Sequence, residues 1–230
     1  MNSVAGGGSF LSFPSLIYAG VPPISANATN NAAMWIGNIG GARGYKEEIE
    51  AHRGLLRSMM IVSVIGSLIG SILLLVTPQD VFTHMIPWLL LFATLVFAAS
   101  PWLVRDKPDT PRHATWQLAA QLCVAVYGGY FGAGMGIVML AVLEFSGLPS
   151  FNAANGVKNV MSVVINGVAL VPFMIARIIV WWFAIPMAVI ALAGGYAGAR
   201  FFRQVPQRTA RAIVIAIGAA ITIAFFLRGA

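Results

Sequence analysis

The recurrence of apolar segments close to bilayer-spanning length constrains this chain more than any other feature. An α-helix needs about 20 predominantly apolar residues to cross the hydrocarbon core of a membrane. Charged residues make up only 9% of the chain, whereas typical soluble domains contain about 25%. The sequence therefore predicts an all-α polytopic membrane protein with about eight transmembrane segments. The expected segments are an apolar run after Gly8 that stops at Gly20, then Ala26–Ala42, Met59–Val76, Met85–Val104, Trp116–Phe145, Asn155–Ile175, Ile178–Phe201 and Ala210–Leu227.

Short connections join these segments, which indicates one membrane domain without a soluble appendage. The net charge is +7, yet the basic residues lie mostly in the short loops, where they act as orientation signals. We therefore expect the lipid bilayer as a partner and no nucleic acid. The single cysteine, Cys123, lies in an apolar segment and permits no internal disulfide, so it is predicted to be a small core residue. No metal and no cofactor are expected.

Polar residues gather in one otherwise apolar stretch, Tyr127–Asn166. An unpaired polar group in hydrocarbon costs several kcal/mol, so this cluster must face protein or a water-filled cavity. The residues that share one helix face, at about 100° per residue, are Asn155, Lys158, Asn159, Ser162 and Asn166. The glycines that interrupt the preceding segment are Gly128, Gly129, Gly132, Gly134 and Gly136. Together they predict a discontinuous helix with exposed backbone N–H groups, followed by a helix with a polar seam.

The two halves of the chain repeat one pattern. The pairs separated by 128 residues are Gly6 and Gly134, Gly8 and Gly136, Asn27 and Asn155, Asn31 and Asn159, and Asn38 and Asn166. In each half a Gly-x-Pro turn, at Gly20 and at Gly147, separates the glycine break from the asparagine-bearing helix. Repeats with glycine-interrupted segments indicate a transporter whose binding site lies at the repeat interface.

Loop charges predict how the two repeats are oriented. Cytoplasmic loops collect Lys and Arg, and three loops hold most of these residues here. All three fall on the inside if Trp116–Phe145 enters the membrane and returns as a re-entrant hairpin folded at its glycines, which makes the repeats inverted. We predict a first membrane repeat at residues 1–104, a basic cytoplasmic loop at 105–113 and a second repeat at 114–230. The leading half-helix of the first repeat is expected to be missing, because only the second has an apolar arm (Ala114–Tyr127) before its break.

The chain resembles the sulfite exporter TauE/SafE family of membrane permeases along nearly its whole length. The segments that carry the resemblance are SVAGGGSFLSFPSLIYAGVPPISANATNN near the start, IPWLLLFATLVFAASPWL, YGGYFGAGMGIVMLA, and the glycine-rich penultimate span. The resemblance implies a multi-pass permease of the bacterial inner membrane that moves small anions, notably sulfite and organosulfonates.

A small anionic substrate needs positive potential and hydrogen-bond donors, and backbone N–H groups at half-helix N-termini supply both. The glycines expected to form such sites are Gly6, Gly7 and Gly8 in the first half and Gly132, Gly134 and Gly136 in the second. The asparagines whose amides are candidate donors are Asn27, Asn31, Asn155 and Asn159. Interhelical hydrogen bonding is the competing interpretation of these asparagines. Lys158 is the candidate electrostatic attractor, or else a paired or snorkelling lysine.

Glu144 has three open interpretations: it carries a coupling proton, pairs with Lys158, or lies at the water interface. No Ser/His/Asp set, no Cys/His cluster and no nucleotide-binding loop is evident, so no catalytic residue is expected and the protein is not predicted to be an enzyme. The alternatives to an anion permease are a carrier of another small solute or a cation, and a non-transporting membrane subunit.

Overall fold

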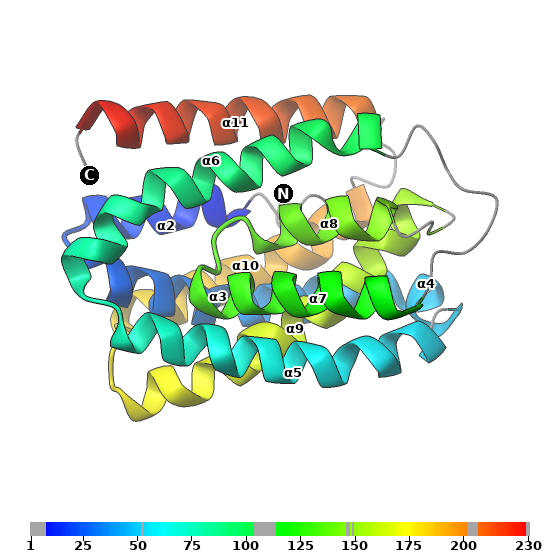
Figure 1. The fold of residues 1–230 in the computed structure, drawn as a ribbon, viewed down its shortest axis with the longest axis horizontal. Helices are drawn as coiled ribbons and strands as arrows, with labels where there is room; N and C mark the ends of the chain where they lie inside the picture. The colour runs from blue at the N-terminus through cyan, green and yellow to red at the C-terminus, as the bar shows by residue number, and fades with distance from the viewer. Residues whose placement is uncertain are drawn as a thin grey trace.

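The computed structural model describes residues 8–51, 53–103, 114–145, 148, 150–201 and 207–228. All regular elements in these ranges are α-helices, and most lie roughly along one long axis (Figure 1). The helices are α2 (Gly8–Tyr18), α3 (Pro23–Gly44), α4 (Lys46–Ala51), α5 (Arg53–Val76), α6 (Gln79–Leu103), α7 (Ala114–Tyr130), α8 (Met135–Phe145), α9 (Phe151–Ile175), α10 (Trp181–Phe201) and α11 (Gln207–Arg228).

Several of these helices are suited to a bilayer. The three that are long and apolar enough to cross it contain Leu56–Val76, Gln79–Ala99 and Asn152–Ile175. Shorter apolar helical stretches occur at Met135–Glu144, Trp181–Ala197 and Ala212–Leu227. The prediction of an all-helical protein is therefore confirmed for the described residues, and three of its helices are long and apolar enough to cross a membrane, whereas the number of eight segments stays a prediction.

The expected segment Trp116–Phe145 forms two helices. α7 ends at Tyr130, residues 131–134 are non-helical, and α8 begins at Met135. The two helices run in opposite directions, so together they form a hairpin (Figure 1). Gly134 has a φ of +83°, and its Cβ, if present, would lie 2.8 Å from the Cβ of Ala93. The break thus occurs where both the backbone conformation and the lack of space require glycine.

The helix ends that flank the three basic loops gather at one end of the bundle, on the right in Figure 1. They are the end of α3 with the start of α5, the end of α6 with the start of α7, and the end of α10 with the start of α11. This is the arrangement that a hairpin at Trp116–Phe145 produces.

Glycines let helices approach closely at two interfaces. A Cβ on Gly66 of α5 would lie 2.8 Å from the Leu122 carbonyl oxygen of α7, and one on Gly40 of α3 would lie 2.7 Å from the Leu192 carbonyl oxygen of α10. Gly195 of α10 likewise faces the backbone of α3, whereas Gly194 is exposed with no neighbouring atom within 4 Å of its Cβ position. Small residues serve this purpose in membrane helix packing because bilayers provide little hydrophobic drive between helices.

Aromatic side chains connect the N-terminal half-helix to the hairpin. Phe13 of α2 packs edge-on against Phe131 in the break, with ring centroids 5.3 Å apart. Phe82 at the start of α6 also packs edge-on against Phe131, at 6.1 Å. All three rings are fully buried, so the break is held inside the protein and away from lipid.

Candidate functional site

A small polar cavity lies where α2 and the α7–α8 hairpin meet the two asparagine-bearing helices, α3 and α9. Its volume is about 10 Å³, roughly the minimum that holds one water molecule. The lining residues are Ser9, Met34, Asn38, Gly132, Met135, Gly136, Lys158, Ser162 and Asn166. They come from α2, α3, the hairpin and α9, so the cavity joins both halves of the sequence.

Two half-helices begin at this cavity. α2 contributes Ser9 from its first turn, and α8 contributes Met135 and Gly136 from its own. Both start near the middle of the bundle and run toward opposite ends (Figure 1). Because the first N–H groups of a helix have no intrahelical acceptor, each N-terminus carries a partial positive charge, roughly half an elementary charge. The cavity therefore receives positive potential from two helix ends.

Lys158 adds a basic side chain to the same cavity. It lies in the second turn of α9 and only 1% of its surface is exposed. Among the described residues that line the cavity there is no carboxylate. Its other polar lining groups are the hydroxyls of Ser9 and Ser162 and the amides of Asn38 and Asn166, which can donate hydrogen bonds to an anion. This combination is suited to a small anion.

Asn27 is bonded to the backbone of the break. Its Nδ2 donates to the carbonyl oxygen of Tyr130 at 3.0 Å, and its Oδ1 accepts from the Gly132 N–H at 3.2 Å. These are backbone groups that the interrupted helix leaves without their regular partners. The amide of Asn27 therefore holds the break in place.

Asn31 connects the two asparagine-bearing helices. Its Nδ2 donates to Oδ1 of Asn166 at 3.2 Å, which joins α3 to α9. The Oδ1 of Asn31 is buried and has no hydrogen-bond partner among the described residues. The neighbouring Asn30 accepts from the Ser12 hydroxyl of α2 at 2.5 Å, and its Nδ2 is likewise unpartnered within the described ranges.

The other predicted site residues lie at varying distances from the cavity. Gly8 opens α2 next to Ser9, and Gly134 lies within the break. Asn155 and Asn159 are fully buried on α9 but do not line the cavity. Gly6 and Gly7 lie outside the described residues.

Glu144 lies at the opposite end of α8 from the cavity and is half-buried. It lies nine positions after Met135, roughly 13 Å along the axis at the helical rise. The side chain is therefore not part of the cavity lining.

Sequence reasoning did not identify Tyr127 as a structural determinant of the site. Its hydroxyl lies 3.1 Å from the carbonyl oxygen of Leu89 on α6 and 3.2 Å from that of Ala133 in the break. A partly buried tyrosine next to a glycine run can satisfy carbonyls that the interrupted helix exposes, and this tyrosine–glycine juxtaposition is the signal that could have identified it. Within the described ranges, no three His, Cys, Asp or Glu side chains are grouped as metal ligands would be.

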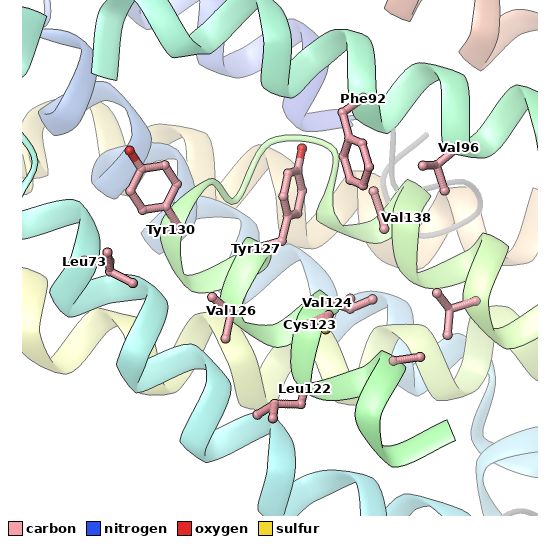
Figure 2. A pocket seen from close by; sticks show the side chains of 12 residues that line it. Leu73, Phe92, Val96, Leu122, Cys123, Val124, Val126, Tyr127, Tyr130 and Val138 are labelled. Atoms are coloured by element: carbon pink, nitrogen blue, oxygen red, sulfur yellow. The ribbon is translucent and has the colours of Figure 1, made fainter. Parts of the chain in front are cut away.

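A larger hollow of about 640 Å³ lies on the outside of the hairpin, between α5, α6, α7 and α8. Figure 2 shows its apolar lining, which includes Val126, Val138 and Phe92. Cys123 is part of this wall and is exposed, so the prediction that it is a core residue is wrong. Most positions of α7 are apolar, and its polar Gln121 is itself buried, so the helical pattern could not separate an outward-facing position from a core position.

Comparison with known proteins identifies the relatives of the chain. A family model described as "Sulfite exporter TauE/SafE" matches residues 1–225. A "Probable membrane transporter protein ORF9" from Sinorhizobium sp is 23% identical over 97% of this chain and 86% of its own length. The "Probable membrane transporter protein YfcA" of Escherichia coli K12 is 26% identical over 95% of this chain and 82% of its own. A "Probable membrane transporter protein" from Haemophilus influenzae is 25% identical, over 94% and 85%. No solved structure matches the chain.

Proposed function

The chain belongs to the sulfite exporter TauE/SafE family, and from this premise we propose that it is a secondary transporter that moves a small anion, sulfite or an organosulfonate, across the bacterial inner membrane. The observation that carries the choice of an anion is the convergence of two half-helix N-termini and Lys158 on one cavity. A buried basic residue near the middle of a membrane protein costs free energy, so the presence of Lys158 there favours a functional role.

The directions of the helices support an architecture of two inverted repeats. Helices that occupy equivalent places in the two halves run in opposite directions along the bundle (Figure 1). These pairs are α2 with α8, α3 with α9, α5 with α10, and α6 with α11. We therefore assign residues 1–104 and 114–230 to the two repeats, with the basic loop 105–113 in the cytoplasm.

Inverted repeats allow transport by alternating access, in which one repeat moves against the other around a fixed central site. The cavity, with room for about one water molecule, is smaller than a sulfite ion and has to expand when substrate binds. The hydrogen bond between the side-chain amides of Asn31 and Asn166 joins α3 to α9 across the repeats. It is one of the contacts that must rearrange when the cavity expands.

The repeats are not equivalent at the position of the cation. Lys158 corresponds to Asn30, 128 residues earlier, and Asn30 bonds to Ser12 of the first half-helix. We infer that the anion binds closer to α9 and α8 than to the opposite half of the site. Asn27, Gly132 and Gly134 shape the break, while Ser162, Gly136 and the N–H groups of α8 are the neighbours of Lys158 that would contact the anion.

Uptake into proteoliposomes tests this function. Radiolabelled sulfite and a panel of small sulfonates are offered to vesicles that contain the native protein, Lys158→Ala or Lys158→Arg. We expect saturable flux of one anion in the native protein. The apparent KM should rise about tenfold or more in Lys158→Ala, because a hydrogen bond to a charged group contributes roughly 1.5–3 kcal/mol. Lys158→Arg should retain part of the affinity, since it keeps the charge.

Lys46 provides the matched control, because it is an exposed lysine at the start of α4. Lys46→Ala should transport as the native protein does. Equal flux in Lys158→Ala and the native protein would exclude Lys158 from the site. Saturable flux of a cation or a neutral solute, with none of any anion, would overturn the proposed substrate class.

A further inference from the structure

A groove of about 460 Å³ opens on the surface between α4, α5 and α9, at the bundle end where the basic loops lie. The lining residues are Ile49, Gly54, Leu56, Arg57, Met60 and Val160. Arg57 is the only charged residue among them, and the others are apolar or lack a side chain. The groove is separate from the central cavity and shares no lining residue with it.

Arg57 has no anionic partner within the protein as far as the structure describes it. Its side chain is exposed, and no described carboxylate forms an ion pair with it, although Glu47, Glu48 and Glu50 lie nearby in the sequence on α4. The residue is the fifth of α5, whose first turn contains no acidic side chain. Arg57 therefore adds its charge to the partial positive charge of the helix N-terminus, and an anion would be stabilised by both.

The groove continues into an apolar surface along α5. Leu56 is 4% exposed and forms part of the groove floor, while Met60 lies one turn below Arg57. Exposed apolar side chains continue this stripe toward the middle of the helix at Ile61, Val64, Ile65 and Leu68. A ligand that matches this surface has one negative charge at its end and a long apolar body.

We propose that this groove binds one anionic phospholipid, with its phosphate on Arg57 and an acyl chain along Met60 and the exposed stripe of α5. A free phosphate would satisfy Arg57 but leave the apolar groove uncovered. A zwitterionic lipid would cover the groove but bring a second positive charge to Arg57. Basic pockets between transmembrane helices on the cytoplasmic side recognise anionic head groups by this combination. The proposal does not depend on the transported substrate.

Lipid-dependent thermal stability tests the proposal. The purified full chain in a neutral detergent is titrated with phosphatidylglycerol, with phosphatidylcholine of the same acyl chains, or with inorganic phosphate, while tryptophan fluorescence reports unfolding. Phosphatidylglycerol should raise the melting temperature of the native protein in a saturable way, and the other two should not. In Arg57→Gln the concentration that gives half of this increase should rise about fivefold, the effect of one basic residue on anionic lipid binding.

Two further variants make the result specific. Arg177→Gln is the matched control, because Arg177 is an exposed arginine in the turn at the opposite end of α9, and it should respond to phosphatidylglycerol as the native protein does. Gly54→Leu keeps Arg57 but fills the groove, since no atom lies within 4 Å of the Gly54 Cβ position, and it should also weaken the response. An equal response in Arg57→Gln, or an equal stabilisation by phosphatidylcholine or by inorganic phosphate, would overturn the proposal.

Discussion

Asn27 and Gly132 are bonded through a side-chain amide and a backbone N–H, at 3.2 Å, across 105 positions of sequence. The same amide donates to the carbonyl of Tyr130 at 3.0 Å, so one side chain satisfies two groups that the interruption of the α7–α8 hairpin exposes. The first repeat thereby stabilises the break of the second. This arrangement places the start of α8 at the central cavity.

Replacement of Asn27 should destabilise the hairpin. Asn27→Ala leaves two partly buried backbone groups without their side-chain partners, and an unsatisfied group costs about 1–3 kcal/mol when it is fully buried. Asn27→Asp, which retains the acceptor for Gly132 and loses the donor to Tyr130, should be less stable than the native protein but compact. Melting temperatures in detergent give the order. Asn152→Ala, at a half-buried asparagine in the first turn of α9, is the control, and an equal effect there would remove the special role of Asn27.

Alanine at Gly134 should be among the most damaging glycine substitutions. The left-handed conformation costs a non-glycine residue roughly 1–2 kcal/mol, and the new Cβ would also lie 2.8 Å from that of Ala93. Gly20 has a similar φ of +85° but no atom within 4 Å of its Cβ position. Gly20→Ala therefore measures the cost of the left-handed backbone conformation without a steric clash. We expect the melting temperature to fall more in Gly134→Ala than in Gly20→Ala, and the reverse order would contradict the packing around the break.

Two glycines separated by 128 residues should respond in opposite ways. A Cβ at Gly66 would lie 2.8 Å from the Cβ of Ala125, so Gly66→Ala should force α5 and α7 apart at a cost of about 1–3 kcal/mol. The Cβ position of Gly194 is open, so Gly194→Ala should be neutral or stabilising, because glycine weakens a helix by roughly 0.5–1 kcal/mol. Unfolding of both variants in mixed micelles measures the difference. Similar stabilities would show that the α5–α7 contact is not tight.

Lys158→Met should separate stability from function. The substitution removes a buried charge and keeps an apolar chain of similar length, and replacing buried ionic groups by apolar ones is often neutral or stabilising, by about 1 kcal/mol or more. We therefore expect a melting temperature at or above that of the native protein together with loss of anion uptake. A variant that is both unfolded and inactive would instead indicate that Lys158 stabilises the protein through its polar contacts.

Cys123 reports the depth of the hairpin in the membrane. It is the single cysteine of the chain and lies exposed in the apolar wall of the outer hollow, near the middle of α7. A fluorophore attached there should be quenched more by lipids with a nitroxide in the middle of the acyl chain than by lipids with a nitroxide at the head group. Stronger quenching by the head-group label would place α7 at the membrane surface.

Much of the fold could be predicted because the relevant signals are local. Apolar length indicates helices that cross a bilayer, and glycines mark the position where Trp116–Phe145 is interrupted, since only glycine adopts the backbone of Gly134 without strain. The period of the helix places Lys158, Ser162 and Asn166 on one face, and all three line the cavity.

The partners of these residues could not be predicted in the same way. Asn27 was a candidate substrate ligand, yet its amide is bonded to the backbone of the hairpin, while Ser9 and Met34 were not candidates and line the cavity. Asn155 and Asn159 share the helix face of Lys158 but do not reach the cavity.

The sequence by itself determined that the chain forms apolar helices of membrane-spanning length. It also determined where α2 begins, where the α7–α8 hairpin is interrupted, and which side chains share a polar face. Only the tertiary structure decided that α2 and α8 begin at one cavity, that Asn27 holds the break, and that Cys123 faces outward. The physical reason is that helical periodicity fixes only the direction in which a side chain points around the axis of the helix that carries it. What that side chain meets is set by helices far away in the sequence, whose crossing depends on the close backbone contacts at Gly40 and Gly66.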